Sequence, residues 1–224
     1  MKRRLAVVCD FDGTAILEDV ADALSIAFGG YENWKATNDA FHAGRIEFEE
    51  LLRRIFEPIT ATAAEVHAFA LERAHFRPGF EELLATCRRR DIRFVLASGG
   101  LDLYIHPALT KLPRELTDGL ELRANHAEYV PGGLDLSFPH AHAPGACGRC
   151  GSCKGAIVKE LQREGMTVLA VGDGNADRCM ARVADHLFAR GRLLDWCRAE
   201  AVACEPFETF QPVLARLEVM AVGR

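Results

Sequence analysis

The sequence predicts an α/β fold: a Rossmann-like parallel sheet core, a helical cap inserted after the first strand, and a small β-hairpin insert. Three observations support this expectation. Short apolar runs end in polar clusters, helical segments separate these runs, and one long interval holds helix signals with no strand. The 224 residues allow one large domain or one domain with an insert, and 49% of them are apolar.

The strands are expected at short apolar runs. Three runs are typical of buried parallel strands: Leu5–Phe11, Asp91–Ala97 and Met166–Val171. His186–Ala189 and Ala201–Cys204 are shorter versions of the same pattern. The second insert, Glu121–Pro139, predicts a hairpin that turns at Val130–Gly133, because alternating apolar residues flank a Pro-Gly-Gly sequence.

Helices are expected between these runs, which makes the sheet parallel. Pro78 is expected at the first position of a helix that continues over Gly79–Arg89. Lys154–Glu164 and Asn175–Val183 have the apolar spacing of two further helices. Strands that alternate with helices in this way indicate a parallel sheet covered by helices.

The interval from Ile16 to Phe76 interrupts the alternation. Glycines and Pro58 separate its apolar-periodic stretches, and Thr62-Ala-Ala-Glu65 is a capping box. The four expected helices are Asp19–Phe28, Trp34–Ala43, Glu47–Phe56 and one that Thr62 opens. We therefore expect a helical cap over residues 16–76 and an α/β core over residues 1–15 and 77–224.

Charge and hydropathy limit the partners. With 27 Lys and Arg against 32 Asp and Glu, the net charge of −5 argues against nucleic-acid binding. No apolar window reaches the ~18 residues of a membrane helix. The basic start Met1–Arg4 precedes an apolar run, Leu5–Cys9, that is too short for the ~7–15 residues of a signal peptide. A cytoplasmic chain without a membrane partner is expected, and its oligomeric state stays open.

Polar clusters follow three of the expected strands. They are Asp10-Phe-Asp-Gly-Thr14, Ser98-Gly-Gly100 and Gly172-Asp-Gly-Asn-Ala-Asp177. Because the carboxyl ends of parallel strands form one crevice, these clusters are expected to meet. Asp10 and Asp12 can face the same way, and Asp173 can join them to offer oxygen ligands for Mg²⁺.

Phosphate ligands are expected beside these carboxylates. The hydroxyl of Ser98 and the amides of Gly99 and Gly100 can donate to phosphate oxygens, and Lys154 adds a positive charge. A carboxylate nucleophile, a second carboxyl group, Mg²⁺ and phosphate-binding donors together predict phosphoryl transfer through an aspartyl-phosphate.

These motifs, in this order, resemble the four motifs of the haloacid dehalogenase superfamily of phosphatases. The helical insert is similar to the type I cap of its phosphoserine-phosphatase-like branch. Within that branch the sequence is similar to the methionine-salvage phosphatases that act on 2-hydroxy-3-keto-5-methylthiopentenyl-1-phosphate. The likeness to this group rests on Asn125-His126-Ala127, Cys150-Gly-Ser-Cys-Lys154, and Phe188-Ala-Arg190 followed by Leu193-Leu194.

The resemblance implies roles for individual residues. Asp10 is the nucleophile, and Asp12 protonates the leaving oxygen and then activates water. Asp10, Asp173 and the carbonyl oxygen of Asp12 hold Mg²⁺, with Asp177 supporting them. Ser98, Gly99 and Lys154 hold the phosphoryl group. The implied activity is a phosphomonoesterase that acts on a small phosphorylated metabolite.

Two cap residues are candidates for substrate contact. Asp19 stands where phosphoserine phosphatase has a substrate-contacting glutamate, and its shorter side chain changes the recognition of a substrate amine. Its alternative role is to cap the helix that starts at Val20. Arg54 is a candidate second contact, and its alternative is an exposed helix face.

A cysteine-rich segment stands out among the eight cysteines. Cys147, Cys150 and Cys153, with His140 and His142 nearby, offer soft ligands for Zn²⁺. The alternatives are reduced thiols at the rim of the site or a redox-sensitive loop. Four of the other cysteines are expected to pack as small apolar residues: Cys9, Cys87, Cys179 and Cys197. The cluster directly precedes Lys154, so ordering this loop would help to position the lysine.

Other functions share parts of this pattern. A phosphoserine-phosphatase-type enzyme or another small-metabolite phosphatase has the same motifs, and so does a phosphomutase. A response-receiver-like domain also phosphorylates an aspartate but lacks a capping insert. A non-catalytic metal-binding module would use the cysteines alone. The complete set of acid, base and phosphate ligands favours a hydrolase.

Overall fold

The structure is a computed structural model that describes residues 4–147 and 150–222. Its seven-stranded sheet has the order β4-β3-β2-β1-β5-β6-β7. The strands are β1 (Arg4–Cys9), β2 (Arg93–Leu101), β3 (Glu121–Val130), β4 (Gly133–Ser137), β5 (Met166–Gly172), β6 (His186–Ala189) and β7 (Glu205–Pro206). All neighbouring strands are parallel except β3 and β4, so the predicted α/β fold is confirmed.

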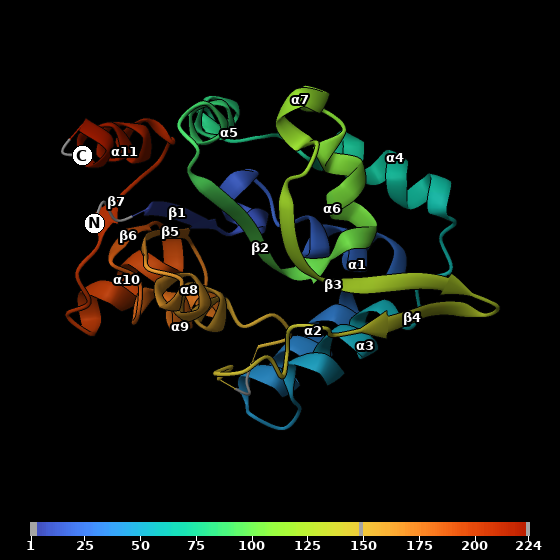
Figure 1. The fold of residues 1–224 in the computed structure, drawn as a ribbon. Helices are drawn as coiled ribbons and strands as arrows, with labels where there is room; N and C mark the ends of the chain where they lie inside the picture. Colours follow the sequence, from blue (N-terminus) through green and yellow to red (C-terminus); the bar gives the residue numbers. More distant parts are fainter. Residues whose placement is uncertain (1–3, 148–149, 223–224) are drawn as a thin grey trace.

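Helices cover both faces of the sheet (Figure 1). One face packs against α5 (Phe80–Arg89), α6 (Asp102–Leu109) and α11 (Gln211–Val222). The other face packs against α8 (Lys154–Arg163), α9 (Arg178–Ala181) and α10 (Gly191–Ala199). The central strand β1 is buried from Leu5 to Cys9, and its alternate side chains enter the two cores. Cys9, Cys87 and Cys197 are buried apolar residues, as predicted.

Four helices form the insert between β1 and α5. They are α1 (Val20–Gly29), α2 (Tyr31–His42), α3 (Phe48–Phe56) and α4 (Ala63–Arg73). The capping box at Thr62 and Glu65 is present. The two connections to the core lie side by side, because Ile16 and Phe76 form an antiparallel bridge and the amide of Arg77 donates to the carbonyl of Ala15 at 2.8 Å. This hinge region places the insert above the carboxyl end of β1 (Figure 1).

Several boundaries differ from the sequence prediction. The helix expected to begin at Pro78 begins at Phe80, because Gly79 precedes it in the left-handed conformation with φ +87°. Strand β2 continues through Ser98-Gly-Gly100 to Leu101, with a shift of its register against β3. The helix expected over Asn175–Val183 is broken into a 3₁₀ turn and the short α9, since Asp177 bonds the preceding loop.

The edges of the sheet also differ. The strand expected at Ala201–Cys204 lies instead at β7, after Ala201 takes a positive φ of 54°. The predicted hairpin is confirmed as β3 and β4, but the first residues of β3 pair with β2, so it extends the main sheet. Helices α6, α7 (Arg114–Thr117), α10 and α11 were not predicted. Lys2 and Arg3 of the basic N-terminal stretch lie outside the described residues.

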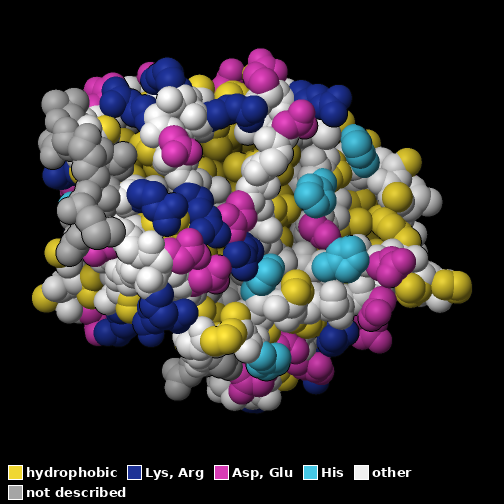
Figure 2. Space-filling view, in the orientation of Figure 1, with side chains coloured by type: hydrophobic (Ala, Val, Ile, Leu, Met, Phe, Trp, Pro, Cys, Tyr) yellow, Lys and Arg dark blue, Asp and Glu magenta, His cyan; other side chains and the backbone are white. Residues whose placement is uncertain are grey.

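The surface is mixed in charge on the face seen in Figure 2, where basic and acidic side chains are intermingled. Within residues 4–147 and 150–222, every helix is too short or too polar to cross a membrane.

Candidate active site

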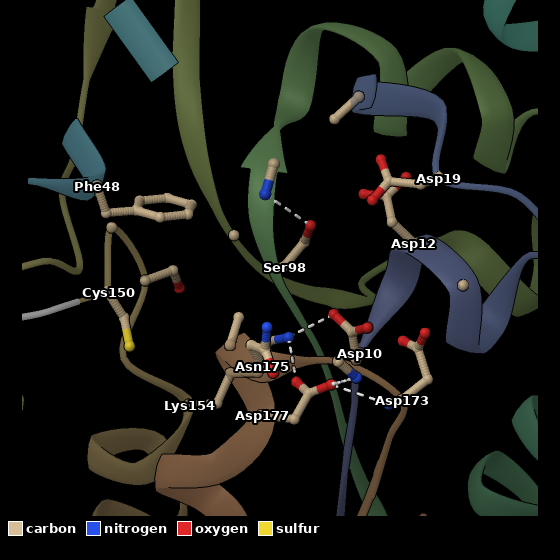
Figure 3. A pocket seen from close by; sticks show the side chains of 18 of the residues that line it. Asp10, Asp12, Asp19, Phe48, Ser98, Cys150, Lys154, Asp173, Asn175 and Asp177 are labelled. Carbon is tan, nitrogen blue, oxygen red and sulfur yellow. Dashed lines mark hydrogen bonds and ion pairs between the residues drawn. The ribbon is translucent and has the colours of Figure 1, made fainter. Parts of the chain in front are cut away.

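A cavity of about 800 Å³ lies between the carboxyl ends of β1, β2 and β5 and the helical insert. Such a volume is typical of a small-molecule site. All three predicted polar clusters line it, so the expected meeting of these strand ends is confirmed in space. Figure 3 shows Asp10, Asp12, Ser98 and Lys154 pointing into this common space.

Asp10 and Lys154 form the floor of the cavity. Asp10 directly follows β1, and its amide donates to the carbonyl of Val171 at 3.0 Å, which fixes it beside β5. The ammonium of Lys154 forms ion pairs with Asp10 and with Asp177, and its side chain is only 1% exposed. Burial alone would lower the pKa of Lys154, but the two carboxylates more than offset this and raise it above its ordinary value.

Three carboxylates share this one cation. Oxygen atoms of Asp10, Asp173 and Asp177 all lie within 4.8 Å of one another. Burial, together with the neighbouring charge of Asp177, raises the pKa of Asp10 and of Asp173. Hard oxygen donors and a local excess of negative charge fit a bound Mg²⁺ ion.

Asp177 differs from the other two carboxylates in having both of its oxygen atoms occupied. Its Oδ1 accepts from Lys154, and its Oδ2 accepts from the amides of Asp173 and Gly174 at 2.9 and 3.0 Å. Asp173 receives one bond, from the hydroxyl of Thr14 at 2.9 Å, on its Oδ1. Asp177 therefore stabilises the loop after β5. Asp10 and Asp173 each keep an oxygen atom that can bind a metal.

Two arginines donate hydrogen bonds to backbone carbonyl oxygens of the loop after β1. The carbonyl of Gly13 accepts from Arg77 at 2.7 Å and from Arg190 at 2.9 Å, and Arg77 also donates to the carbonyl of Thr14. Gly13 has φ +70°, and a Cβ there would lie 2.5 Å from Asp173. The sequence does not predict this role for Arg77, because that residue follows the insert and only the fold brings it back to the loop.

Asp12 has different partners from Asp10. Its Oδ2 accepts from the hydroxyl of Tyr104 at 2.6 Å, and its Oδ1 accepts from the amide of Val20 at 3.0 Å. Burial raises the pKa of Asp12 to about 6, although both hydrogen bonds act to lower it. A carboxyl group with such a pKa can give and take a proton near neutral pH.

Tyr104 reaches Asp12 only because Gly100 lies between them. A Cβ on Gly100 would lie 1.6 Å from the Tyr104 hydroxyl oxygen. Tyr104 is fully buried in α6, and burial raises the pKa of its hydroxyl, so it acts as a donor. The sequence did not identify Tyr104, since a tyrosine in an apolar helix is ordinarily a core residue.

The predicted phosphate ligands from β2 face the same cavity. Ser98 is 1% exposed, and its hydroxyl oxygen accepts from the amide of Gly100 at 2.9 Å, which leaves its proton free to be donated. The carbonyl of Gly99 accepts from the side chain of Asn125 at 2.7 Å. Asn125 thereby fixes the backbone of the strand end that lines the cavity.

The insert covers the cavity with a mainly apolar surface. Asp19 caps α1 by accepting from the amide of Asp22 at 2.9 Å, and it also lines the cavity near Asp12 (Figure 3). Desolvation within the cavity, together with the charge of Asp12, raises the pKa of Asp19, although part of its surface stays exposed. The cavity-facing side of α3 consists of Phe48, Leu51, Leu52 and Ile55.

Arg54 is not brought into the cavity. It points to the opposite side of α3, where it forms an ion pair with Glu50 at 2.7 Å and is 49% exposed. Arg54 therefore lies on an exposed helix face, the alternative to a substrate contact. Among the described residues, the insert contributes no lysine or arginine to the cavity lining.

The cysteine-rich loop, residues 147–153, also lines the cavity. Its cysteines do not have all the neighbours that the sequence predicts. Cys147, Cys153 and Cys179 come together, whereas the two histidines lie apart from them. His142 contacts Glu49 of α3 at 3.2 Å, and His140 pairs with the backbone of Ser152. Cys179, which the sequence predicts to be an apolar packing residue, instead joins the cluster from α9.

Comparisons with known proteins agree with this fold. A family model of the haloacid dehalogenase-like hydrolases matches residues 7–182. A 2-hydroxy-3-keto-5-methylthiopentenyl-1-phosphate phosphatase from Geobacillus thermodenitrificans is 32% identical over 99% of this chain and 100% of its own length. The enzyme of that name from Exiguobacterium sibiricum is 29% identical, with 97% and 98% covered.

Solved structures give the same fold. A phospho-aspartyl intermediate analogue of phosphoserine phosphatase superposes with a TM-score of 0.69 at 22% identity, covering 96% of this chain and 99% of its own. A probable phosphoserine phosphatase from Vibrio cholerae has a TM-score of 0.73 at 22% identity, covering 99% and 66%.

The fold and the site define a capped Rossmann-like enzyme whose cavity is built around clustered carboxylates. The chain belongs to the haloacid dehalogenase-like hydrolases, and within that family it is a phosphatase. Phosphatases of this family generally use Mg²⁺ and act on small phosphorylated substrates.

Proposed function

We propose that this chain hydrolyses a small phosphomonoester through an aspartyl-phosphate on Asp10. The observation that carries the proposal is that two aspartates of one loop have different hydrogen-bond partners. Asp10 pairs with the buried ammonium of Lys154, whereas Asp12 is held by Tyr104 and the amide of Val20. The ammonium of Lys154 favours the ionised form of Asp10 against the burial that raises its pKa, whereas burial raises the pKa of Asp12 to about 6 with no cation of the described residues in direct contact.

Each residue then has a step in the reaction. Asp10 attacks phosphorus, while Ser98, the amide of Gly99 and the ammonium of Lys154 bind the phosphoryl oxygens. Asp12 donates its proton to the leaving oxygen, which departs as an alcohol or enol. The Asp12 carboxylate then accepts a proton from water as that water attacks the aspartyl-phosphate, and phosphate is released.

The residues also suit a bound Mg²⁺ ion. Asp10, Asp173 and the carbonyl oxygen of Asp12 would hold it, and Asp177 would support them through the loop after β5. When bound, the ion supplies positive charge that neutralises the phosphate oxygens. No step of this reaction uses zinc. If the cysteine cluster binds a Zn²⁺ ion, we propose that the ion has a structural role.

For the substrate, we propose the methionine-salvage enol phosphate that the curated relatives are named for. The inner side of α3 offers Phe48, Leu51, Leu52 and Ile55, which suit an apolar methylthio chain. Phosphoserine is the alternative, but the described part of the insert lines the cavity with no lysine or arginine, so its carboxylate would have to reach the arginines on the core side of the cavity. None of the eight cysteines, all of them described, forms a disulfide, which is typical of a reducing compartment, so we propose the cytoplasm as the place of action.

Two substitutions test the mechanism. Asp10→Asn should abolish turnover and leave no covalent intermediate. Asp12→Asn should still release p-nitrophenolate from p-nitrophenyl phosphate, because this leaving group needs little acid help, and then stall. The expected result is a burst of roughly one product per site, followed by turnover slowed ~10²–10⁴-fold, with phosphate on Asp10 after rapid quenching.

A substrate panel tests the specificity with the wild-type enzyme. The enol phosphate should give the highest kcat/KM, phosphoserine a much lower one, and both should release inorganic phosphate only when Mg²⁺ is present. Phosphoryl return to the substrate would indicate a phosphomutase. Wild-type steady-state turnover by Asp12→Asn, or labelling at another residue, would contradict the mechanism independently of the substrate.

A further inference from the structure

Four cysteine side chains meet at the rim of the active-site cavity. Three come from the loop before α8, and the fourth, Cys179, comes from α9. The sulfur atoms of Cys147, Cys153 and Cys179 all lie within 4.8 Å of one another. The sulfur of Cys150 lies 3.2 Å from that of Cys147, just outside the group of three, and supplies the nearest fourth sulfur.

These distances match one small tetrahedral ion. With Zn–S bonds of ~2.3 Å, the sulfur atoms of a tetrahedral site are about 3.8 Å apart. The contacts at 3.2 Å and at 4.0 Å, the latter between Cys153 and Cys179, bracket that value. An iron–sulfur cluster would hold its cysteines farther apart, because they bind different iron atoms.

Backbone groups around the cluster point their donors at the sulfur atoms. The amide of Cys147 donates to the sulfur of Cys153 at 3.3 Å, and the amide of Gly155 donates to that of Cys179 at 3.4 Å. Such bonds stabilise thiolate ligands. Cys147 is exposed and Cys150 and Cys179 are half-buried, so the cluster is a poor apolar core.

We propose that Cys147, Cys150, Cys153 and Cys179 bind one structural Zn²⁺ ion as a four-thiolate site. Each thiol releases its proton on binding, and the resulting site carries a net charge of −2. Four protein ligands leave no open position, so the ion has no catalytic water. His140 and His142 are not among the ligands, because neither imidazole belongs to the cluster of sulfur atoms and His142 faces Glu49 instead.

A zinc ion at this site would help to position Lys154 and Asp177. Cys153 directly precedes Lys154, and Cys179 follows Asp177 by two residues. Lys154 and Asp177 form the buried ion pair at the cavity floor, at 2.5 Å. Zinc would therefore tie together the two chain segments that carry this pair. Figure 3 shows Cys150 on the loop that leads into Lys154.

Metal analysis of the protein purified without added metal tests the proposal. We expect about one zinc per chain, and titration of the wild-type protein with a mercurial thiol reagent should release it into a zinc indicator. Cys179→Ser and Cys150→Ser should lose most of the zinc. The matched control Cys204→Ser should retain it, as should His140→Ala and His142→Ala, because none of these residues belongs to the cluster.

The outcomes separate the proposal from its alternatives. Native protein without zinc, in which all four thiols react freely with iodoacetamide, would overturn it in favour of reduced or redox-active thiols. Iron in place of zinc would overturn the identity of the ion, and full zinc content in Cys179→Ser would overturn the ligand set. The wild-type titration decides the matter even where a variant fails to fold. None of these readouts depends on phosphatase activity.

Discussion

At the scale of single residues, the site depends on how two neighbouring aspartates are made different. Both follow β1, with Asp10 buried and Asp12 half-buried, yet one faces an ammonium and the other faces a hydroxyl and an amide. Sequence spacing predicts that the two carboxylates lie together. It does not predict their partners, since Lys154 and Tyr104 lie 144 and 92 residues away from them.

Tyr104→Phe tests the hydroxyl that faces Asp12. The variant keeps the ring and its packing but removes the donor at 2.6 Å, a bond to an ionisable group worth ~1.5–3 kcal/mol. Without that bond, the pKa of Asp12 rises and its carboxylate is a less available base. We expect kcat for alkyl phosphates to fall about 10–100-fold with little change in KM.

The control for this substitution is Tyr129→Phe, in the exposed hairpin, which should behave as wild type. If Tyr104→Phe retained the wild-type kcat, the amide of Val20 alone would suffice to position Asp12.

At the scale of elements, the strand ends were predictable, whereas the packing of Tyr104 against Gly100 was not. Polar clusters after apolar runs identify Asp10, Ser98 and Asp173, because parallel strands bring their carboxyl ends together. The sequence predicts that the strand ends at Ala97, whereas it continues through Ser98-Gly-Gly100 to Leu101. Gly100 is needed for the close approach of Tyr104, a contact that only the packing of α6 on β2 creates.

Helix α3 provides a matched pair of substitutions on its two sides. Phe48→Ala removes an apolar surface from the cavity, and the burial of such a side chain is worth ~1.5–3 kcal/mol. We expect kcat/KM for a substrate with an apolar chain to fall about 10–100-fold. Arg54→Ala lies on the exposed side and should leave kcat/KM unchanged.

Steady-state kinetics with the best natural substrate distinguishes the two sides of α3. A large loss in Arg54→Ala would mean that the arginine leaves Glu50 and enters the cavity during turnover. Equal losses in both variants would point to a general effect on the fold of the insert.

At the scale of the whole molecule, the sequence predicts that there is a cap and where it is inserted. It does not predict which core residues the cap contacts. The helices of the insert are local in sequence, so their spacing identifies them. Their contact with the core joins distant segments. The guanidinium of Arg53 lies 5.1 Å from the ring centre of Phe138, and a Cβ on Gly151 would lie 2.7 Å from the ring of Phe48.

The paired connections at Ile16 and Phe76 suggest that the insert moves as a lid on a short hinge. Closure would exclude water while the aspartyl-phosphate forms. Hydrogen exchange with and without Mg²⁺ and orthovanadate, a mimic of the transferring phosphoryl group, measures this motion. We expect amides of α3 and of residues 150–152 to exchange several-fold more slowly with the ligand, because the lid then spends less time open.

Helix α11 is the internal control for this experiment, since it packs on the far side of the core and should exchange at the same rate in both states. Arg53→Ala removes the contact with Phe138 and should weaken the protection of α3 without changing that of β2. Protection of residues 98–100 with no change in α3 would mean that ligand binds without the lid. Closure would then be set by the contacts already present between α3 and the cysteine-rich loop, and ligand would add nothing to them.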